Sequence, residues 1–529
     1  MKPILPRLNR IHTPAQAHAS RYVITLVVTL ATTLEMLDNT VVSVAIPSMM
    51  GNLGATLDEI AWVTTGYAIA NAIIVPISSW LGDLFGRRNY FALSILVFIV
   101  SSVLCGTAST VQELVLWRIV QGLAGGGLIP MSTLTLFSIF PPTELGIGLA
   151  IWGAGLNLGP ALGPMFAGWL TDTLSWPWIF YINLPIGAVT LLLALMYVPD
   201  GEPVEKPGRI DFTGLVLLAV AIGCLQAMIE RGERQGWFES SEIMAYAVLC
   251  ALAVPLFIWH ERRVPHPIID LGVFRNRQFL GTLPIGMMVG AVAYMTGIST
   301  PVFLQTQLGY TALQAALAQI PWVIALIISF AIVGKMTSNP RIDMRYVIFA
   351  GLIVLAWSLW LNGNLTLQAG NDDILLPLAG RGVGIAMSIL PLASLAVLQL
   401  PPHQVGVGNS LYNLFRQVGG SLGVAAFTSL LEQRTHLNRG ELVAQVHSLS
   451  PQAADRLDQW RQLFLAHGDP PLQAASRALQ MVDGTVNQQA AISAFNQIYV
   501  LFALAVLVTL LAVPVMVSGR VAAGSSPSH

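Results

Sequence analysis

The chain is poor in charged residues, in cysteine and in the sequence motifs of soluble enzymes. Asp, Glu, Lys and Arg make up only 10% of its 529 residues, whereas 54% are hydrophobic. About a quarter of the residues of an ordinary soluble domain are charged, so this composition excludes that class. The three cysteines, Cys105, Cys224 and Cys250, lie in apolar segments without the spacing of metal ligands. We interpret them as packing residues that indicate no redox compartment.

The motifs that bind nucleotides and metals are also missing. The sequence holds no GxxxxGK[ST], no HExxH and no CxxC, and none of its nine histidines lies deep in an apolar segment. GAGLNLG at residues 153–159 is similar to a dinucleotide-binding turn, but its last glycine comes one residue late and no βαβ pattern surrounds it. We therefore expect neither an ATP-driven pump nor an enzyme, and no cofactor, no metal and no nucleic-acid partner.

Apolar runs of about twenty residues, the length that crosses a lipid bilayer, recur along the whole chain. They predict an all-α polytopic membrane protein with about fourteen transmembrane helices. The predicted spans begin near residues 22, 60, 89, 113, 145, 177, 213, 243, 280, 315, 345, 374, 405 and 498.

The basic residues indicate how these spans are oriented. An even number of spans places both termini on one side, and the short loops of that side hold most of the Lys and Arg residues, whereas the opposite short loops hold only Arg231 and Arg234. The positive-inside rule then predicts cytoplasmic termini. No cleavable signal pattern precedes the first span, so we expect Tyr22 to Ala45 to be retained as a helix. The basic residues of the predicted cytoplasmic side are Lys2, Arg7, Arg10, Arg21, Arg87, Arg88, Lys206, Arg209, Arg262, Arg263, Arg275, Arg277, Lys335, Arg341, Arg345 and Arg520.

Three charged residues lie inside predicted spans of the first half. Glu35 and Asp38 are three residues apart in LEMLDNTVVSVAIP, so they share a helix face. Carboxylates within a span are costly and often mark proton or ion pathways, and Arg118 in LWRIVQGLAGGGLIP needs a partner, for which these two acids are the candidates. We expect the two acids to mark a proton or ion pathway and Arg118 to pair with one of them. Two alternatives stay open: the acids could reach headgroup water near a helix end, and Arg118 could bind backbone carbonyls.

The fifth span, IWGAGLNLGPALGPMFAGWL, carries small residues at four-residue spacing. Gly155, Gly159, Gly163 and Ala167 form one bare face, with Pro160 and Pro164 beside it. In lipid such a face lets another helix approach closely, and neighbouring helices can satisfy the carbonyls that proline leaves free. The alternative is a kinked, tightly packed helix with no further role.

A short basic loop, SSWLGDLFGRRNY, joins the second and third spans. Gly86 permits a tight turn there, and Asp83 lies at a helix end, where it could pair with Arg87, Arg88 or a neighbouring helix terminus. Simple anchoring on the basic side of the membrane explains the arginines but not Asp83.

These stretches resemble the motifs of the major facilitator superfamily, and specifically its 14-helix drug:proton antiporters of the EmrB type. GPALGPMFAGWL is similar to the antiporter motif, to which Gly155, Gly159, Pro160, Gly163, Pro164 and Gly168 would belong. The basic loop resembles the signature loop although Ser79, Gly82 and Leu84 depart from it. LEMLDNTVVSVAIP, LWRIVQG and SWPWIFYINLPIG resemble the first-, fourth- and sixth-helix patterns, with Pro177 in place of the usual Arg.

The resemblance implies a major facilitator fold of two six-helix bundles plus two extra helices. We expect the N-terminal bundle at residues 1–200, the extra pair at 201–262, and the C-terminal bundle at 263–529 with a periplasmic segment at about 432–494. That segment is predicted to form two or three short helices. In the family the signature loop acts as a conformational latch, a role that would fall to Asp83, Gly86, Arg87 and Arg88.

The implied function is proton-coupled efflux of lipophilic or amphiphilic compounds across the bacterial inner membrane by alternating access. The resemblance assigns the coupling to protons to Glu35, Asp38 and Arg118. The periplasmic segment could dock a periplasmic adaptor and thus an outer-membrane channel. An exporter of one metabolite and a non-transporting sensor or assembly partner remain alternatives. Polar residues within spans are the candidates for a substrate cavity, although capping or packing is an equal alternative for the last two: Tyr67, Asn71, Asn157, Tyr294, Gln305, Asn413 and Arg416.

Overall fold

The computed structural model describes residues 14–141, 144–199, 211–265, 267–339, 341–445 and 451–516, and these residues form helices and no strand. Several basic residues used to orient the chain, Lys2, Arg7, Arg10, Lys206, Arg209 and Arg520, lie outside the described residues.

The first half of the chain holds eight helical segments of the described residues. They are α1 (Pro14–Leu53), α2 (Leu57–Phe85), α3 (Arg87–Thr107), α4 (Val111–Gly125), α5 (Leu128–Ile139), α6 (Leu145–Thr173), α7 (Trp178–Tyr181) and α8 (Asn183–Tyr197). Two further helices, α9 (Phe212–Arg231) and α10 (Ser241–Glu261), follow.

The second half repeats this order with α11 (Arg277–Thr306), α12 (Ala312–Leu317), α13 (Ile320–Thr337), α14 (Met344–Asn362), α15 (Asn371–Leu398), α16 (Val405–Gln445), α17 (Pro451–Ala466) and α18 (Pro471–Thr509). Four short 3-10 turns lie at Trp237–Glu239, Leu271–Arg275, Pro402–Gln404 and Leu510–Val515.

Thirteen segments of the described residues are long and apolar enough to cross a membrane, which confirms the polytopic all-α prediction. The remaining predicted span, from residue 405, corresponds to α16, which is not among the thirteen. Its many polar residues lower its hydropathy, although it packs closely on α11 and α2 inside the molecule. The exact count of fourteen therefore stays a prediction.

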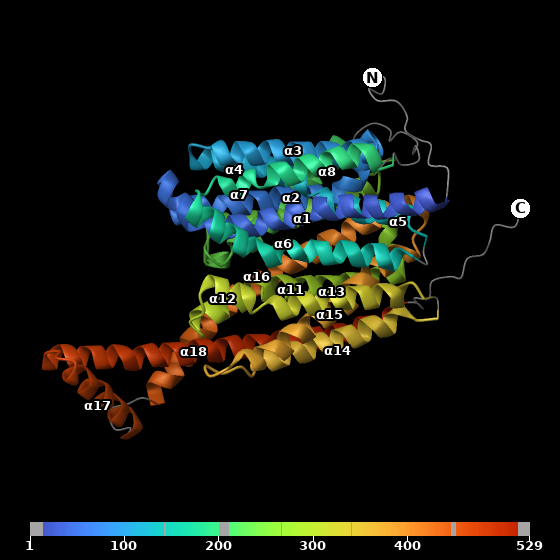
Figure 1. Ribbon diagram of the computed structural model, residues 1–529. Coiled ribbons are helices and arrows are strands. Elements are labelled where there is room, and N and C mark those ends of the chain that lie inside the picture. The colour runs from blue at the N-terminus through green and yellow to red at the C-terminus, as the bar shows by residue number, and fades with distance from the viewer. Residues whose placement is uncertain are drawn as a thin grey trace, which may run out of the picture.

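The helices form two bundles that lie side by side, α1 to α8 in one and α11 to α18 in the other (Figure 1). Their packing is equivalent: α1 lies on α6 as α11 lies on α16, and α2 on α4 as α13 on α15. Between the bundles, α6 contacts α13 and α16 contacts α2. We call the end where α2 gives way to α3 the latch end, and the opposite end the far end.

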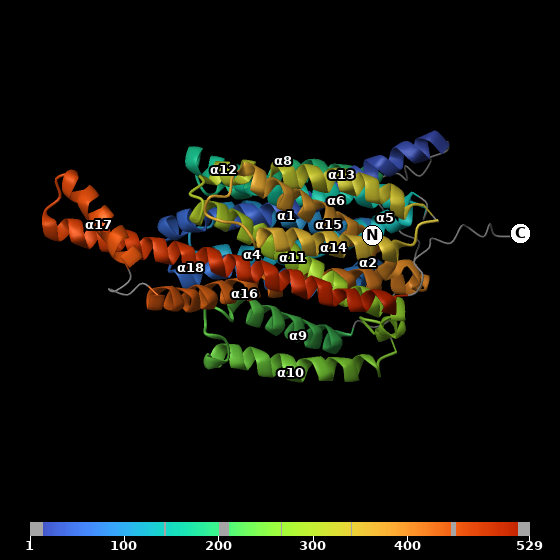
Figure 2. The same ribbon diagram turned by 90° about the horizontal axis from the view of Figure 1, so that it is seen from below.

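The extra pair, α9 and α10, is central in the sequence but lies at the edge of the molecule. Figure 2 shows it beside the bundles, where α9 packs on α2 and α16 while α10 contacts mainly α9. Of the boundaries predicted for the three parts, the one at residues 200/201 lies outside the described residues, and the one at 262/263 stays a prediction that follows directly on the end of α10.

Three predicted spans are interrupted rather than continuous. The fourth span breaks between α4 and α5 at consecutive glycines, where a Cβ on Gly126 would collide with the Asn71 carbonyl and one on Gly127 with the Tyr90 ring. The sixth and tenth spans each begin with a short helix, α7 and α12. Glycine allows the chain to bend where side chains would prevent this close approach.

Two helices extend well beyond the bilayer thickness at the far end. α16 has 41 residues and α18 has 39, and at 1.5 Å per residue each is about 60 Å long, twice the hydrocarbon core of a membrane. Their outer parts and α17 form a structure that we call the projection, visible beyond the other helices in Figure 1. The prediction of two or three short helices was wrong here, because α17 is the one separate helix among the described residues of this segment.

Hydrogen bonds between the two long helices explain why they continue past the membrane. Arg439 of α16 donates to Asp483 at 2.8 Å and to Asn487 at 2.6 Å, both on α18. Asn438 donates to the Ala490 carbonyl at 3.3 Å. These bonds stabilise a polar two-helix stem that hydropathy alone does not reveal.

Candidate functional site

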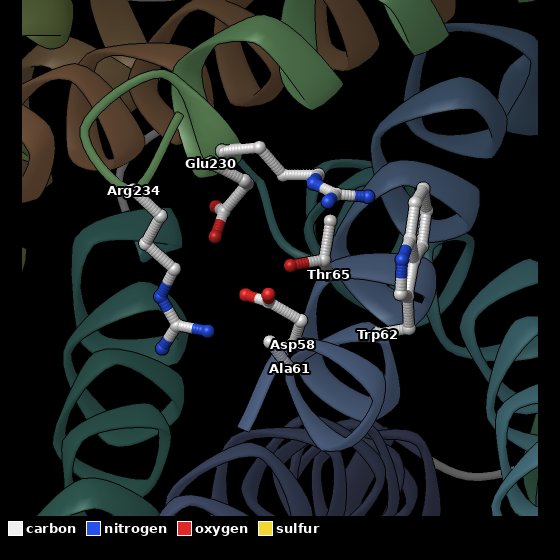
Figure 3. Close-up of a pocket in the computed structure, with 7 residues that line it drawn as sticks. Asp58, Ala61, Trp62, Thr65, Glu230 and Arg234 are labelled. Atoms are coloured by element: carbon white, nitrogen blue, oxygen red, sulfur yellow. The ribbon is translucent and has the colours of Figure 1, made fainter. Parts of the chain in front are cut away.

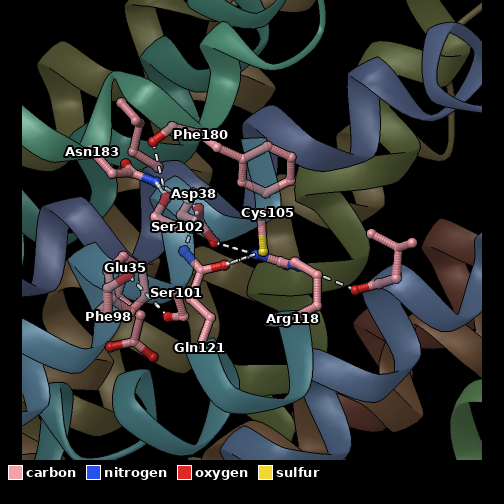
Figure 4. Close-up of polar contacts among 12 residues, drawn as sticks. Glu35, Asp38, Phe98, Ser101, Ser102, Cys105, Arg118, Gln121, Phe180 and Asn183 are labelled. Atoms are coloured by element: carbon pink, nitrogen blue, oxygen red, sulfur yellow. Dashed lines mark hydrogen bonds and ion pairs between the residues drawn. The ribbon is translucent and has the colours of Figure 1, made fainter. Parts of the chain in front are cut away.

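The centre of the first bundle holds an ion pair with no exposure to solvent. Arg118 of α4 donates from Nη1 to Oδ2 of Asp38, on α1, at 2.6 Å, and both side chains are 0% exposed (Figure 4). Of the two acids that were candidates to pair with Arg118, the structure places Asp38 in contact with it. The alternative, in which the acid reaches headgroup water, does not fit its complete burial.

The second oxygen of Asp38 is held by two neutral amides. Oδ1 accepts from Gln121 Nε2 at 3.0 Å and from Asn183 Nδ2 at 2.6 Å. Asn183 also donates to the Ser102 hydroxyl at 3.0 Å. The carboxylate network, defined as Asp38, Arg118, Gln121, Asn183 and Ser102, thus joins α1, α3, α4 and the start of α8.

Arg118 has partners on three sides besides the carboxylate. Its Nη1 also donates to Gln121 Oε1 at 2.8 Å, and its Nε donates to the Val63 carbonyl at 3.2 Å. The Tyr67 ring lies 4.1 Å from the guanidinium carbon, within the range of a cation–π interaction. Hydrogen bonds to a charged partner are stronger than those to a neutral carbonyl. The bond to the Val63 carbonyl is therefore secondary to the ion pair with Asp38 in holding this arginine.

Glu35 lies on the same helix but has different partners. Its Oε1 accepts from Asn71 Nδ2 at 2.9 Å, and the side-chain Oδ1 of Asn71 accepts from Gln417 Nε2 of α16 at 2.9 Å. Glu35 is 2% exposed, and its Oε2 has no hydrogen-bond partner in the structure. A chain of two hydrogen bonds therefore runs from this carboxyl across the boundary between the bundles, with Arg416 close enough for an electrostatic interaction.

The small residues of α6 pack directly on the turns of α1 that carry these acids. A Cβ on Gly159 would lie 2.7 Å from the Leu37 amide nitrogen, and Cβ atoms on Gly155 and Gly163 would collide with Thr29 and Thr40. Pro160 and Pro164 lie within this continuous helix. Gly168 is off the interface, since a Cβ there would meet nothing within 4 Å. The bare face of α6 thus sets the distance between α6 and the helix that carries both acids.

The basic loop of the latch end forms a tight turn. Gly86 has φ of 84°, a conformation that side chains disfavour, and it separates α2 from α3. Asp83 and Arg87 are 3.8 Å apart on adjoining ends of these helices. Arg88 is half-buried beside them. The loop residues lie together as the motif requires, whereas their role as a latch remains a prediction.

The two bundles also touch each other at the latch end. Asn409 of α16 donates to the Pro130 carbonyl at 2.9 Å and accepts from Thr133, of α5, at 2.9 Å. The Ser78 and Ser410 hydroxyls are 3.2 Å apart. These buried polar contacts hold the latch end together in this conformation.

The residues predicted to line a cavity fall into separate groups. Tyr67 and Asn71 adjoin the two acids, and Asn413 and Arg416 are buried on the part of α16 that faces them, with Asn413 donating to the Asn409 carbonyl at 3.0 Å. Tyr294 is half-buried against Gly420. The remaining two do not join this group: Asn157 donates to its own helix at Gly153, and Gln305 is exposed at the end of α11.

A charged pocket lies at the far end between α2 and α9 (Figure 3). Its lining includes Asp58, Trp62 and Glu230, together with two arginines. The guanidinium of Arg231 lies 4.4 Å from the Trp62 ring and its Nη1 is 3.1 Å from Glu242. These contacts of Arg231 connect the extra helix pair to α2 of the first bundle.

Sequence reasoning assigned no role to Asn183, Ser102 or Gln417. Asn183 and Ser102 complete the bonding of Asp38, and Gln417 links Asn71 to the second bundle. The signal available in the sequence was the presence of amides in otherwise apolar spans, in IFYINLPIG and in NLFRQVGG.

The chain is similar in sequence to known membrane proteins. The Major Facilitator Superfamily pattern matches residues 28–424. The multidrug export protein EmrB of Haemophilus influenzae is 33% identical over 452 residues, which cover 84% of this chain and 87% of the relative. The fatty acid resistance protein FarB of Neisseria gonorrhoeae is 31% identical over 504 residues, 94% of this chain and 97% of the relative.

The fold is similar to that of solved transporters. The crystal structure of the human organic anion transporter MFSD10 matches with a TM-score of 0.56 at 14% identity, covering 94% of this chain and 100% of that one. At this identity the likeness concerns the fold alone. With the two-bundle architecture, the motif geometry and the match over most of its length, the chain belongs to the major facilitator superfamily.

Proposed function

We propose that the protein exports lipophilic or amphiphilic compounds across the bacterial inner membrane in exchange for protons, by alternating access. The observation that carries this proposal is the fully buried pair of Arg118, on α4, and Asp38, on the helix α1 against which α6 packs. A buried ion pair is an expensive feature that a purely structural helix bundle does not need. The names of the relatives, a multidrug export protein and a fatty acid resistance protein, support the choice of small lipophilic substrates.

Proton binding would act on the pair by removing its negative charge. A protonated Asp38 no longer balances Arg118, so the neutral form favours a conformation in which α1 and α4 move apart. Glu35 offers a second proton site three residues away, and its bond to Asn71 connects it to Gln417 of the other bundle. Protonation of this carboxyl therefore changes an interaction that spans the two bundles.

The conformational cycle uses the contacts of the latch end. We assign this end to the cytoplasm, together with both termini, from the excess of basic residues on that side. The bonds of Asn409 to α5 close it here. Opening toward the cytoplasm requires these bonds and the Asp83–Arg87 turn to rearrange, and substrate would enter among Tyr67, Asn71, Tyr294, Asn413 and Arg416.

A two-arm transport experiment tests the proposal. Everted membrane vesicles energised with NADH should take up a lipophilic cationic dye, and a protonophore should abolish the uptake. The Asp38→Asn variant should show none, whereas Asp372→Asn, at an exposed acid in the first turn of α15, should transport normally. Energised uptake that survives Asp38→Asn would contradict the coupling role. A wild type that moves one metabolite but no dye would indicate a dedicated exporter, and one that moves nothing would indicate a sensor.

The projection is the proposed docking site for a periplasmic adaptor of a tripartite pump, which would continue to an outer-membrane channel. It extends from the far end and exposes large apolar side chains, among them Leu437, Leu463, Leu472 and Leu479. Exposed apolar groups on a polar stem are typical of a protein contact surface.

Replacement of the tip tests this assignment more cleanly than deletion of the whole segment, which would cut into both long helices. Residues 446–470 would be replaced by a short Gly-Ser linker that keeps the α16–α18 stem and its Arg439 bonds. We expect loss of adaptor co-purification with dye uptake into vesicles retained. Adaptor binding that is unchanged in this variant, and also when the exposed leucines of the stem are replaced by serine, would contradict the assignment.

A further inference from the structure

The second bundle contains a buried arginine without a carboxylate. Arg381 of α15 is 1% exposed, and its Nη1 donates to the Thr300 hydroxyl at 2.7 Å and to the Thr296 carbonyl at 3.3 Å. Its Nε and Nη2 have no hydrogen-bond partner, and no described acid lies within ion-pair distance of it. The Trp322 ring lies 4.8 Å from the guanidinium carbon.

The equivalence of the two bundles identifies what this arginine corresponds to. In chain order α11, α13 and α15 take the places of α1, α2 and the α4–α5 pair, and α15 packs on α11 and α13 as the α4–α5 pair packs on α1 and α2. Arg381 therefore corresponds to Arg118, each lying two to three turns from the far end of its helix. In both bundles the arginine bonds to the first helix and lies against an aromatic ring of the second.

One partner differs between the two sites. Where the first bundle presents Asp38 to its arginine, the second presents the neutral hydroxyl of Thr300. Trp322 replaces Tyr67 as the aromatic neighbour. The second bundle thus builds the same cradle for a guanidinium and omits the negative charge.

A guanidinium that is buried without a counter-charge is strongly unfavourable. Its planar fork suits a carboxylate, which can accept two parallel bonds from Arg. Three buried donors near one another lack acceptors here: Nε and Nη2 of Arg381 and Nε1 of Trp322. An anionic group would supply acceptors to these donors and the missing charge to the arginine.

We propose that Arg381 binds the carboxylate of a lipophilic molecule between α11, α13 and α15. The apolar spans around the arginine favour a ligand whose remainder is hydrophobic, which distinguishes it from an inorganic anion. As a statement about transported substrates this rests on the proposed export function, whereas the binding step does not depend on it.

Binding of 2-naphthoate to the purified protein in lipid nanodiscs tests the site, with neutral 2-naphthamide and chloride as comparison ligands. We expect 2-naphthoate to bind at least tenfold more tightly than 2-naphthamide and to resist competition by 0.1 M chloride. Arg381→Gln should lower the affinity at least tenfold. Ser388→Ala, two turns along the same helix, is the matched control and should leave the affinity unchanged, because that hydroxyl bonds only to its own helix at Gly384.

Thr300→Asp keeps the test decisive if Arg381→Gln fails to fold. The new carboxylate gives Arg381 the internal partner that Arg118 has in Asp38, so the variant should fold and should lose 2-naphthoate binding at least tenfold. Unchanged affinity in Thr300→Asp, equal binding of the amide, or full displacement by chloride would each overturn the proposal. Uptake of a cationic dye by the wild type separates the two proposals. If the dye is not taken up, the proposed export of varied lipophilic compounds is contradicted, whereas binding of 2-naphthoate still decides whether Arg381 forms a carboxylate site.

Discussion

Replacing Asp38 by Asn is the sharpest perturbation of the carboxylate network. The side chain keeps its size but loses its charge, so Arg118 stays buried without a partner. The amide NH2 of the new side chain would also face donors, since Arg118, Gln121 and Asn183 all donate to Asp38. Removal of one member of a buried ion pair costs about 3–5 kcal/mol, and we expect Asp38→Asn to lower the free energy of unfolding by that amount.

The size of this effect can be attributed to the pair by a double-mutant cycle. Arg118→Gln should cost a similar amount, but the double variant should cost little more than either single change, because neither charge is then left alone. The coupling energy should be at least about 2 kcal/mol. Detergent-induced unfolding in mixed micelles measures the free energies, and NADH-driven dye uptake measures transport, which all three variants should lack.

Glu35→Gln is the matched comparison in the same measurement. Glu35 accepts a bond from neutral Asn71 rather than from a cation, and a Gln carbonyl can accept the same bond. We expect its free energy of unfolding to fall by no more than about 1 kcal/mol. Equal losses in the Asp38 and Glu35 variants, or strictly additive costs of the Asp38 and Arg118 changes, would refute the view that the ion pair organises this bundle.

Three further outcomes are expected. Gly159→Val should separate α6 from α1 and destabilise the protein by about 1–3 kcal/mol in thermal unfolding, whereas Gly168→Ala should have no effect, since no atom lies within 4 Å. Asn409→Ala should favour opening of the latch end, visible as longer spin-label distances between α5 and α16; unchanged distances would refute this. Asp211→Ala should cost about 1 kcal/mol by removing the N-cap of α9 and the bond to His260. Burial raises the pKa of Asp211, but the hydrogen bonds from Gly214 and His260 outweigh this effect and lower the pKa below 3.8. The stabilisation by the Asp211 carboxylate is therefore present above pH 3.8 and is lost in more acidic solution. Unfolding measured over a series of pH values would follow this loss.

The sequence predicted the class of fold well because membrane helices can be recognised from the length and apolar composition of their segments. It did worse where a helix is polar. The sequence pattern predicted a loop with short helices where the outer parts of α16 and α18 lie. The hydrogen bonds of Arg439 that stabilise these parts join residues more than forty positions apart, so a local pattern does not reveal them. Breaks such as the one before α5 depend on how closely glycines approach a neighbouring helix, which composition does not reveal.

At the site, the sequence named the charged residues that the structure brings together in the first bundle, but it could not decide which acid pairs with Arg118. Glu35 and Asp38 are a turn apart on one face, and either could have paired with Arg118. The choice is made by Asn183, which lies 145 residues away and joins Asp38, while Gln417 holds the amide that bonds Glu35. Such partners come from other helices, so no local spacing predicts them.

The length of α16 has a mechanical consequence. One unbroken helix carries Asn409 at the latch end, Gln417 at the level of Glu35, and Gln445 in the projection. A rigid rod of about 60 Å works as a lever arm: a tilt of about 10° around its latch end moves its tip by about 10 Å. A tilt that began at the level of Glu35 would therefore move the projection, outside the membrane, by the width of a helix.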